Sequence, residues 1–226
     1  MSRDSPGRVP RGDTDHDVVL FDLDGVLVDS RVPFARAVNA SLTDQGLSAR
    51  PEHELHQYLG PPLHQTFQTL VRDEALVQPC VDAYRAHYRE LAASETTVFP
   101  GIREVLEALS DRLRLLIATS KPRALAEPLV ETLDLRQFFA AVVGPELDIE
   151  NERKSITIAR AIGRFAPGSR PVVIGDRKHD IEGAHEHDIR AIGVLWGIGS
   201  ETELINAGAD ALVRNPTELA TLLTGG

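Results

Sequence analysis

Two aspartates with one leucine between them, Asp22 and Asp24, directly follow the apolar run at residues 18–21 of the 226-residue chain. Neighbouring carboxylates repel each other, and burying them costs free energy unless a cation offsets their charge. Carboxylate oxygens are ligands that Mg²⁺ prefers, and the sequence has no histidine-rich or cysteine-rich cluster that would favour a softer metal. If the strand continued through both aspartates, their side chains would face the same side of it. The spacing therefore predicts a magnesium site at the end of this strand.

Short apolar, β-branched runs recur along the second half of the chain and alternate with segments of helical period at 122–133, 155–165 and 179–187. This alternation predicts a parallel sheet, and strands that are apolar throughout fit a sheet covered by helices on both faces. We therefore expect an α/β fold with a Rossmann-like, doubly wound parallel sheet. The expected strands are residues 18–21, 113–120, 140–144, 170–176, 190–197 and 210–213.

One region breaks this alternation, because residues 32–97 show no convincing strand. Three stretches of helical pattern, at 31–45, 61–75 and 77–94, are separated by glycines and prolines, which interrupt helices. We therefore expect an all-helical insertion within the α/β pattern. The expected division is a flexible tail at 1–15, an α/β core at 16–29 and 98–226, and the helical insertion at 30–97.

Polar side chains stand where three of the expected strands end. Asp22 and Asp24 follow the first, Thr119 and Ser120 end the second, and Asp176 ends the fourth. Ligands of open parallel sheets bind beyond the carboxyl ends of the strands, so these groups are expected to converge. A single acid at a strand end is most simply a turn or helix-capping residue. Three acids at one edge of a sheet favour a shared metal ion.

These stretches resemble the motifs of the haloacid dehalogenase superfamily. DLDGVLVDS, which begins at Asp22, is similar to the first motif, Asp-x-Asp-Gly-Thr/Val, and LLIATS, which ends at Ser120, resembles the second. Lys154 lies where the lysine of the third motif would lie, and VVIGDRKHDI resembles the fourth. The motifs occur in the family's order, in a match that spans residues 17–223. YLGPPLHQTF and GVLWGIGSETELINAGADALV further resemble the branch that contains phosphoglycolate phosphatases and nucleotidase-like hydrolases.

The resemblance implies catalytic roles for four residues. Asp22 would be the nucleophile that forms an aspartyl-phosphate. Asp24 would protonate the leaving oxygen and then activate water as a general base. Thr119 and Lys154 would hold the phosphoryl oxygens and offset charge in the transition state.

The resemblance also implies a set of metal ligands. Asp22 and Asp176 would bind Mg²⁺ through their carboxylates, and Asp24 through its backbone carbonyl. Asp180, the second acid of the fourth motif, would anchor the metal site from its outer shell. Mg²⁺ is the one cofactor that we expect.

Four further residues are expected to contact the substrate. Gly25 would let the chain turn away and expose amide donors to phosphate, and Ser120 lies beside Thr119 at the same strand end. The resemblance implies that the α/β core is the catalytic core and that the helical insertion at 30–97 is a cap that closes over the site. In this cap, Gly60 and His64 of YLGPPLHQ would face the leaving group from a stiff loop at a helix start. An ordinary interhelical turn with a surface histidine is the alternative for this loop.

The chain holds 21 arginines but only three lysines, Lys121, Lys154 and Lys178. All three fall in or beside the motif segments. A lysine retained in so arginine-rich a chain suggests that a compact cationic donor is needed there. For Lys121 and Lys178, a surface position at a helix start explains the residue equally well.

We therefore expect a Mg²⁺-dependent phosphatase that hydrolyses a small phosphomonoester metabolite, either phosphoglycolate-like or a nucleotide. A phosphosugar mutase of the same superfamily is the alternative enzyme, since it would use the same Asp22 and Asp24. A non-catalytic phosphate-binding protein is disfavoured, because such a protein would be expected to have lost Asp22, Asp24 or Lys154. The expected cap holds no lysine, which argues against a phosphonate hydrolase, and Asp24 argues against a true dehalogenase.

The composition of the chain limits which partners and which cellular location we expect. The formal charge of −10 argues against a nucleic-acid or anionic-membrane partner. No stretch approaches the ~18 apolar residues that a membrane span requires. With one cysteine, Cys80, the chain forms no intrachain disulfide. We expect a cytoplasmic monomer or homodimer whose partner is a small phosphorylated metabolite.

Overall fold

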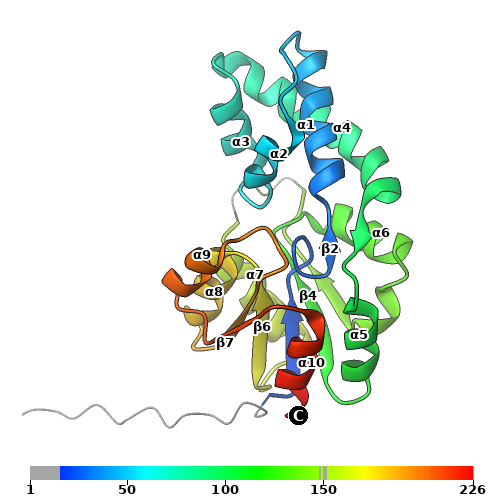
Figure 1. Ribbon diagram of the computed structural model, residues 1–226, viewed down its shortest axis with the longest axis vertical. Coiled ribbons are helices and arrows are strands. Elements are labelled where there is room, and N and C mark those ends of the chain that lie inside the picture. The colour runs from blue at the N-terminus through cyan, green and yellow to red at the C-terminus, as the bar shows by residue number, and fades with distance from the viewer. Residues whose placement is uncertain (1–15, 148, 150–151, 226) are drawn as a thin grey trace, which may run out of the picture.

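The structure is a computed structural model that describes residues 16–147, 149 and 152–225, so the expected tail at 1–15 lies outside the described residues. Figure 1 shows a sheet flanked by helices in the lower part of the molecule and a group of helices above it. The two parts are contributed by different stretches of the chain, as the sequence pattern predicts.

Parallel strands form the central sheet, which has six members within the described residues. They are β1 (Val18–Phe21), β4 (Arg114–Ala118), β5 (Ala141–Val143), β6 (Pro171–Gly175), β7 (Arg190–Val194) and β8 (Ala211–Val213). Their order is β5-β4-β1-β6-β7-β8, so the chain proceeds outward from β1 to one side and then to the other. Such a reversal of strand order leaves a crevice at the carboxyl ends of the central strands.

Helices cover both faces of the sheet, which explains why its strands are apolar along their length. Val19 and Phe21 of β1 pack in a buried cluster with one group of helices, whereas Val18 and Leu20 pack with the other. The first group is α5 (Ile102–Ser110), α6 (Arg123–Thr132) and α10 (Pro216–Thr224). The second is α7 (Lys154–Phe165), α8 (Lys178–His185) and α9 (Glu201–Asn206). The predicted fold class, a doubly wound parallel sheet, is confirmed.

The upper helices lie between two short strands, β2 (Val28–Asp29) and β3 (Thr97–Val98), which pair antiparallel where the chain leaves and re-enters the lower part. We call residues 31–95 the helical segment. Phe34 and Tyr84 pack edge to face across it, with ring centroids 5.7 Å apart. Its helices are α1 (Arg31–Asp44), α2 (Glu52–Leu55), α3 (Leu63–Leu70) and α4 (Val77–Glu95), with 3₁₀ turns at His56–Tyr58 and Glu74–Leu76. The division of the chain into core and cap domains stays a prediction.

Several boundaries differ from the expected ones. The single helix expected at 61–75 is wrong: α3 ends at Leu70, and the Asp73 side chain accepts a hydrogen bond from the Ala75 N–H and starts a separate 3₁₀ turn. The expected strands at 113–120 and 190–197 end earlier, at Ala118 and Val194. Strands β2 and β3 were not expected, because two residues are too few to show a strand period. A further 3₁₀ turn at Arg136–Phe138 precedes β5.

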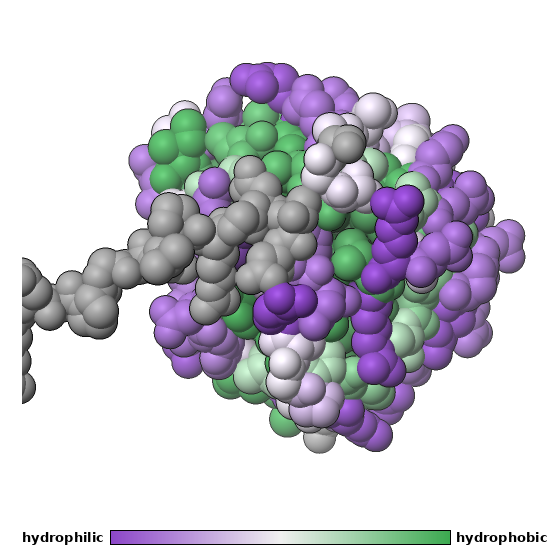
Figure 2. All heavy atoms as spheres, turned by 90° about the horizontal axis from the view of Figure 1, so that it is seen from below, coloured by the Kyte–Doolittle hydropathy of each residue, from purple (hydrophilic) through white to green (hydrophobic). Residues whose placement is uncertain are grey.

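Figure 2 shows the end of the molecule opposite the helical segment, where hydrophobic and hydrophilic residues are interspersed. Large apolar side chains that are exposed, such as Val32, Ile156 and Ile205, lie on separate helices. Within the described ranges, no helix has both the length and the apolar character needed to cross a membrane. The expectation of a monomer or homodimer stays a prediction.

Candidate active site

The sheet register brings three polar strand ends to the same level. Phe21 at the end of β1 pairs with Ile117 of β4 and with Ile174 of β6. The residues that follow these strands, Asp22, Thr119 and Asp176, therefore emerge side by side at the crevice of the sheet. This convergence follows from the parallel order of the strands.

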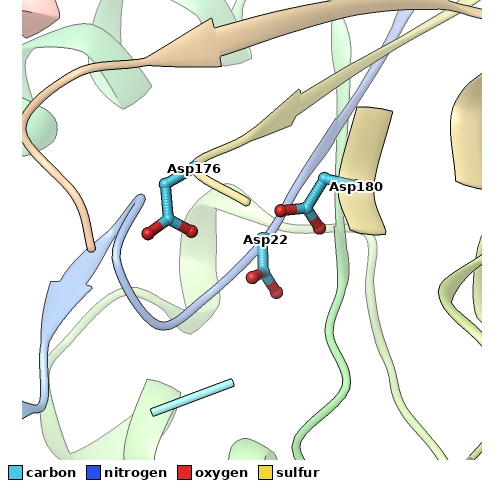
Figure 3. Close-up of side chains that lie close together, drawn as sticks. All are labelled: Asp22, Asp176 and Asp180. Carbon is cyan, nitrogen blue, oxygen red and sulfur yellow. The ribbon is translucent and has the colours of Figure 1, made fainter. Parts of the chain in front are cut away.

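Three aspartates form a compact group at this edge. One carboxylate oxygen each of Asp22, Asp176 and Asp180 lies within 4.8 Å of the other two. Figure 3 shows the three side chains arriving from separate segments, with Asp180 reaching across from α8. Asp176 and Asp180 are buried. We call Asp22, Asp176 and Asp180 the acidic cluster.

Lys154, the first residue of α7, lies against the acidic cluster. Its Nζ lies 2.7 Å from Asp22 Oδ1 and 2.6 Å from Asp180 Oδ1, so it forms an ion pair with each carboxylate. Burial alone would lower the pKa of Lys154, but the two carboxylates raise it above its usual value. Burial raises the pKa of Asp22 to about 6, although Lys154 opposes this rise. Lys154 therefore stays a cation that only partly neutralises its neighbours.

Asp176 is the least neutralised member of the acidic cluster. Its Oδ2 accepts a hydrogen bond of 2.7 Å from the Ile198 N–H, whereas its Oδ1 is buried and has no hydrogen-bond partner among the described residues. Burial, followed by the charges of Asp180 and Asp22, raises the pKa of Asp176 well above its usual range. Three carboxylates and one ammonium leave excess negative charge in a buried space. The residues present therefore fit a divalent cation with oxygen ligands.

Asp24 lies outside the acidic cluster. The expectation that its side chain faces the same side as Asp22 applied only to a strand that continues through both residues, and this condition is not met. Strand β1 ends at Phe21, and the chain turns before Asp24. The Asp24 carboxylate accepts hydrogen bonds from the Ser30 hydroxyl and from Lys121 Nζ, the latter at 2.7 Å. Metal binding through the backbone carbonyl of Asp24 stays a prediction.

Lys121 is a site residue that sequence reasoning left undecided. Its side chain is only 8% exposed, and its Nζ donates to both Asp24 and the hydroxyl of Tyr88, each at 2.7 Å. The ammonium also lies 4.8 Å from the centroid of the Tyr88 ring. The surface interpretation is therefore wrong for Lys121, whereas Lys178 is exposed at the start of α8. We call Asp24, Ser30, Lys121 and Tyr88 the Lys121 cluster.

Gly25 shapes the turn that separates the two clusters. Its φ of 87° lies in the left-handed region, and a side chain there would overlap the Asp176 carboxylate. Its own N–H donates to Val28 O at 2.9 Å. The chain does turn at Gly25, and the expectation that this turn exposes amide donors to phosphate stays a prediction.

Thr119 and Ser120 follow β4. Thr119 is buried, and its hydroxyl oxygen accepts a hydrogen bond of 3.1 Å from the Lys121 N–H, which leaves the hydroxyl hydrogen for another acceptor. Ser120 is exposed beside it.

A cavity of about 620 Å³ lies between the strand ends and the helical segment. The helical segment contributes the loop before α3 and one side of α4, including Tyr84 and Tyr88. Asp176 and Gly25 are buried and are not among the residues that line the cavity. The expected site residues that line it are Asp22, Asp24, Gly60, His64, Thr119, Ser120, Lys154 and Asp180. Both clusters thus contribute side chains to the lining of one cavity.

A family model described as haloacid dehalogenase-like hydrolase matches residues 19–194. The chain belongs to this family. A 5'-nucleotidase of Pseudomonas aeruginosa is 38% identical over 82% of this chain and 86% of its own length. A phosphoglycolate phosphatase of Chromobacterium violaceum is 32% identical over 92% of this chain and 96% of its own length. The crystal structure of a predicted phosphatase from Clostridium acetobutylicum has a TM-score of 0.86 and 33% identity, over 93% of this chain and 99% of that one.

A tyrosine-protein kinase, PtkA of Mycobacterium tuberculosis, is also 33% identical over 86% of this chain, which spans 65% of that protein. The similarities support a hydrolase acting on phosphoric monoesters, in the branch that includes phosphoglycolate phosphatases. The relatives differ in what they are named for, so the family does not fix the substrate.

Proposed function

We propose that this protein is a Mg²⁺-dependent phosphatase that hydrolyses a small phosphomonoester metabolite through an aspartyl-phosphate on Asp22. The observation that carries the proposal is the separation of two neighbouring aspartates. Asp22 lies in the negative, buried acidic cluster, and Asp24 is held by Lys121 on another side of the same cavity. Such a separation suits two carboxyl groups with different tasks.

Asp22 is the proposed nucleophile. Its carboxylate attacks phosphorus, the ester oxygen departs, and the covalent phosphate is later cleaved by water. Lys154 holds the Asp22 carboxylate in place at 2.7 Å. Mg²⁺ bound by Asp22, Asp176 and the backbone carbonyl of Asp24 would offset the negative charge that gathers on the phosphoryl oxygens. Asp180 orients this group through Lys154 and through the Arg177 N–H, which donates to Asp180 Oδ2 at 3.1 Å.

Asp24 is the proposed proton-transfer residue. It gives a proton to the departing ester oxygen and then takes one from the attacking water, so the carboxyl group returns to its starting state. Thr119 and Ser120 border the cavity, and their hydroxyls would donate to phosphoryl oxygens. These assignments account for the four catalytic residues expected from the sequence.

The substrate is proposed as a phosphorylated metabolite of modest size. A cavity of about 620 Å³ can enclose either a short phosphorylated acid or a nucleoside monophosphate. The names of the nucleotidase and phosphoglycolate phosphatase relatives agree with this range. Gly60 and His64 line the side of the cavity where the leaving group would lie. No nucleic-acid or membrane partner is proposed, and a cytoplasmic location remains the expectation from the sequence.

The test is a screen of the full-length protein with phosphoglycolate, 5'-nucleotides and hexose phosphates, with and without Mg²⁺. Release of inorganic phosphate above that of the Asp22→Asn variant supports a phosphatase. Conversion of one hexose phosphate isomer into another, without phosphate release, would instead identify the mutase alternative. Hydroxylamine trapping during turnover should label Asp22, and label on another residue would overturn the proposed intermediate.

A further inference from the structure

Arg177 joins the acidic cluster to the helical segment, although the expected roles gave it no function. It follows Asp176 directly and precedes α8. Its backbone N–H donates to Asp180 Oδ2 at 3.1 Å, so its main chain belongs to the framework of the acidic cluster. Its side chain extends the other way, toward the loop that precedes α3.

The Arg177 guanidinium is fixed at both ends. Nε donates to Glu203 Oε1 of α9 at 2.9 Å, and Nη1 donates to the backbone carbonyl of Leu59 at 2.7 Å. The same Glu203 oxygen accepts a hydrogen bond of 2.9 Å from the Lys178 N–H. Burial would raise the pKa of Glu203, but the bonds from Lys178 and Arg177 lower it overall, so its carboxylate remains charged opposite the guanidinium. The guanidinium is planar, so the bond from Nε to the Glu203 carboxylate also limits the movement of Nη1, the nitrogen that donates to Leu59.

The loop that Arg177 contacts is built for a close approach. Gly60 has a φ of 109°, and a methyl group added to its Cα would lie 3.1 Å from Arg177 Nη1. Pro61 and Pro62 follow, and α3 begins at Leu63. Residues 59–64 all line the cavity. Gly60 therefore serves the fit of this loop against Arg177 as well as the backbone angle.

We propose that Arg177 is a positioning residue that determines specificity, because its guanidinium holds residues 59–64 at the height over the cavity that suits one size of leaving group. This inference rests on the proposed phosphatase function of the same cavity. Leu59 O is a backbone acceptor, so the bond fixes the loop whatever side chains the loop carries. A small ester that does not reach the loop needs no such support.

Direct binding of a second anionic group of the substrate is the rival role for Arg177, since its side chain also borders the cavity. The two roles predict different behaviour in the absence of substrate. A positioning role requires that the loop loosens when the guanidinium is removed. A binding role leaves the free loop as it is.

The first measurement is hydrogen–deuterium exchange of the substrate-free protein, followed in peptides that cover residues 55–67. Arg177→Met should speed exchange there about threefold or more, since the Leu59 N–H bonds His56 O beside the loosened carbonyl. Glu203→Ala should raise the exchange rate less, because it removes the carboxylate that holds the guanidinium but keeps the Arg177 side chain that donates to Leu59. Lys178→Met is the matched control: it removes a neighbouring positive charge, and the Lys178 backbone bond to Glu203 survives. Unchanged exchange in Arg177→Met, or an equal rise in Lys178→Met, would overturn the proposal, and this result does not depend on activity.

The second measurement compares kcat/KM for the best metabolite with kcat/KM for p-nitrophenyl phosphate. Arg177→Met should lower the first about tenfold or more and the second by less than about threefold, and Arg177→Lys should recover little because it lacks the fork. Gly60→Val should reproduce the selective loss, because its side chain would displace the loop from Arg177. Equal losses on both esters would overturn the specificity role even if exchange is faster. Absence of turnover in the unaltered protein would instead count against the proposed function, and the exchange data would still decide the positioning role.

Discussion

Two regions of the cavity are each built around a lysine that pairs with carboxylates, but the two regions differ in their balance of charge. Around Lys154, the carboxylates of Asp22 and Asp180 share one ammonium, with Asp176 beside them, and every group comes from the sheet and its flanking helices. Around Lys121, one carboxylate faces one ammonium, and Tyr88 of the helical segment completes the cluster. The acidic cluster is therefore short of positive charge, whereas the Lys121 cluster is balanced but depends on where the helical segment lies.

The largest expected effect is the loss of turnover in Asp22→Asn. The amide is nearly isosteric, so the fold should persist, but it cannot form the covalent phosphate. We expect kcat to fall about a thousandfold or more. Turnover within about tenfold of the unaltered protein, measured on the best substrate of the screen, would rule out Asp22 as nucleophile.

The charge deficit of the acidic cluster predicts that a divalent cation stabilises one region and not the other. Activity should be lost in excess chelator and restored by Mg²⁺, whereas Ca²⁺ should inhibit because it accepts more ligands at longer distances and would misplace Asp22. Mg²⁺ should also raise Tm in the unaltered protein and in Lys121→Met, but much less in Asp176→Asn. Full activity in chelator, or the same Tm shift in Asp176→Asn, would remove the distinction between the clusters.

The raised pKa of Asp22 predicts how stability depends on pH in the metal-free protein. Folding raises this pKa from 3.8 to about 6, so the native state binds more protons than the unfolded state within this interval. Stability contributed by Asp22 is therefore present below about pH 4 and is lost as pH rises through 6, a change of order 1–3 kcal/mol. In chelator, Tm of Asp22→Asn relative to the unaltered protein should rise between pH 4 and pH 7. A difference in Tm that does not change with pH would show that Lys154 already balances the cluster.

The sequence allowed the acidic cluster to be predicted more fully than the Lys121 cluster, for a physical reason. Asp22 and Asp176 directly follow apolar runs, and parallel strands bring their carboxyl ends together regardless of detail. The position of Asp24 depends on the turn after Phe21, which a period-2 pattern does not reveal. Its partner Lys121 was singled out only by the scarcity of lysine.

The contacts between the helical segment and the rest of the chain could not be predicted from the hydrophobic pattern of the sequence. Tyr88 lies at a position of α4 where the helical period predicts an ordinary core residue. Its ring does pack in the core, stacked on Tyr84 with 5.3 Å between the ring centroids. The Tyr88 hydroxyl accepts a hydrogen bond from Lys121, which lies 33 positions later in the chain. Arg177 donates to the backbone carbonyl of Leu59, which lies 118 positions earlier. Pairings at such separations follow from how two folded parts meet, which no local period encodes.

The smallest expected effect concerns the Tyr88 hydroxyl and tests whether the helical segment influences Asp24. Tyr88→Phe keeps the ring under the Lys121 ammonium and removes only the acceptor 2.7 Å from it. Loss of one such bond is worth about 1 kcal/mol, or roughly fivefold in rate if Asp24 is less well placed. Tyr84→Phe is the matched control, because Tyr84 is a buried tyrosine in the same aromatic stack and Lys121 donates instead to Tyr88.

The leaving group separates placement of Asp24 from general loosening of the fold. An alkyl phosphate needs a proton on its departing oxygen, whereas p-nitrophenolate leaves well without one. Tyr88→Phe should therefore slow kcat for an alkyl phosphate about fivefold and leave that for p-nitrophenyl phosphate within about twofold. Lys121→Met, which removes the cation itself, should show the same selectivity with a larger loss. If Tyr88→Phe and Tyr84→Phe slow both esters alike, the hydroxyl only stabilises the fold, and Lys121 holds Asp24 without help from the helical segment.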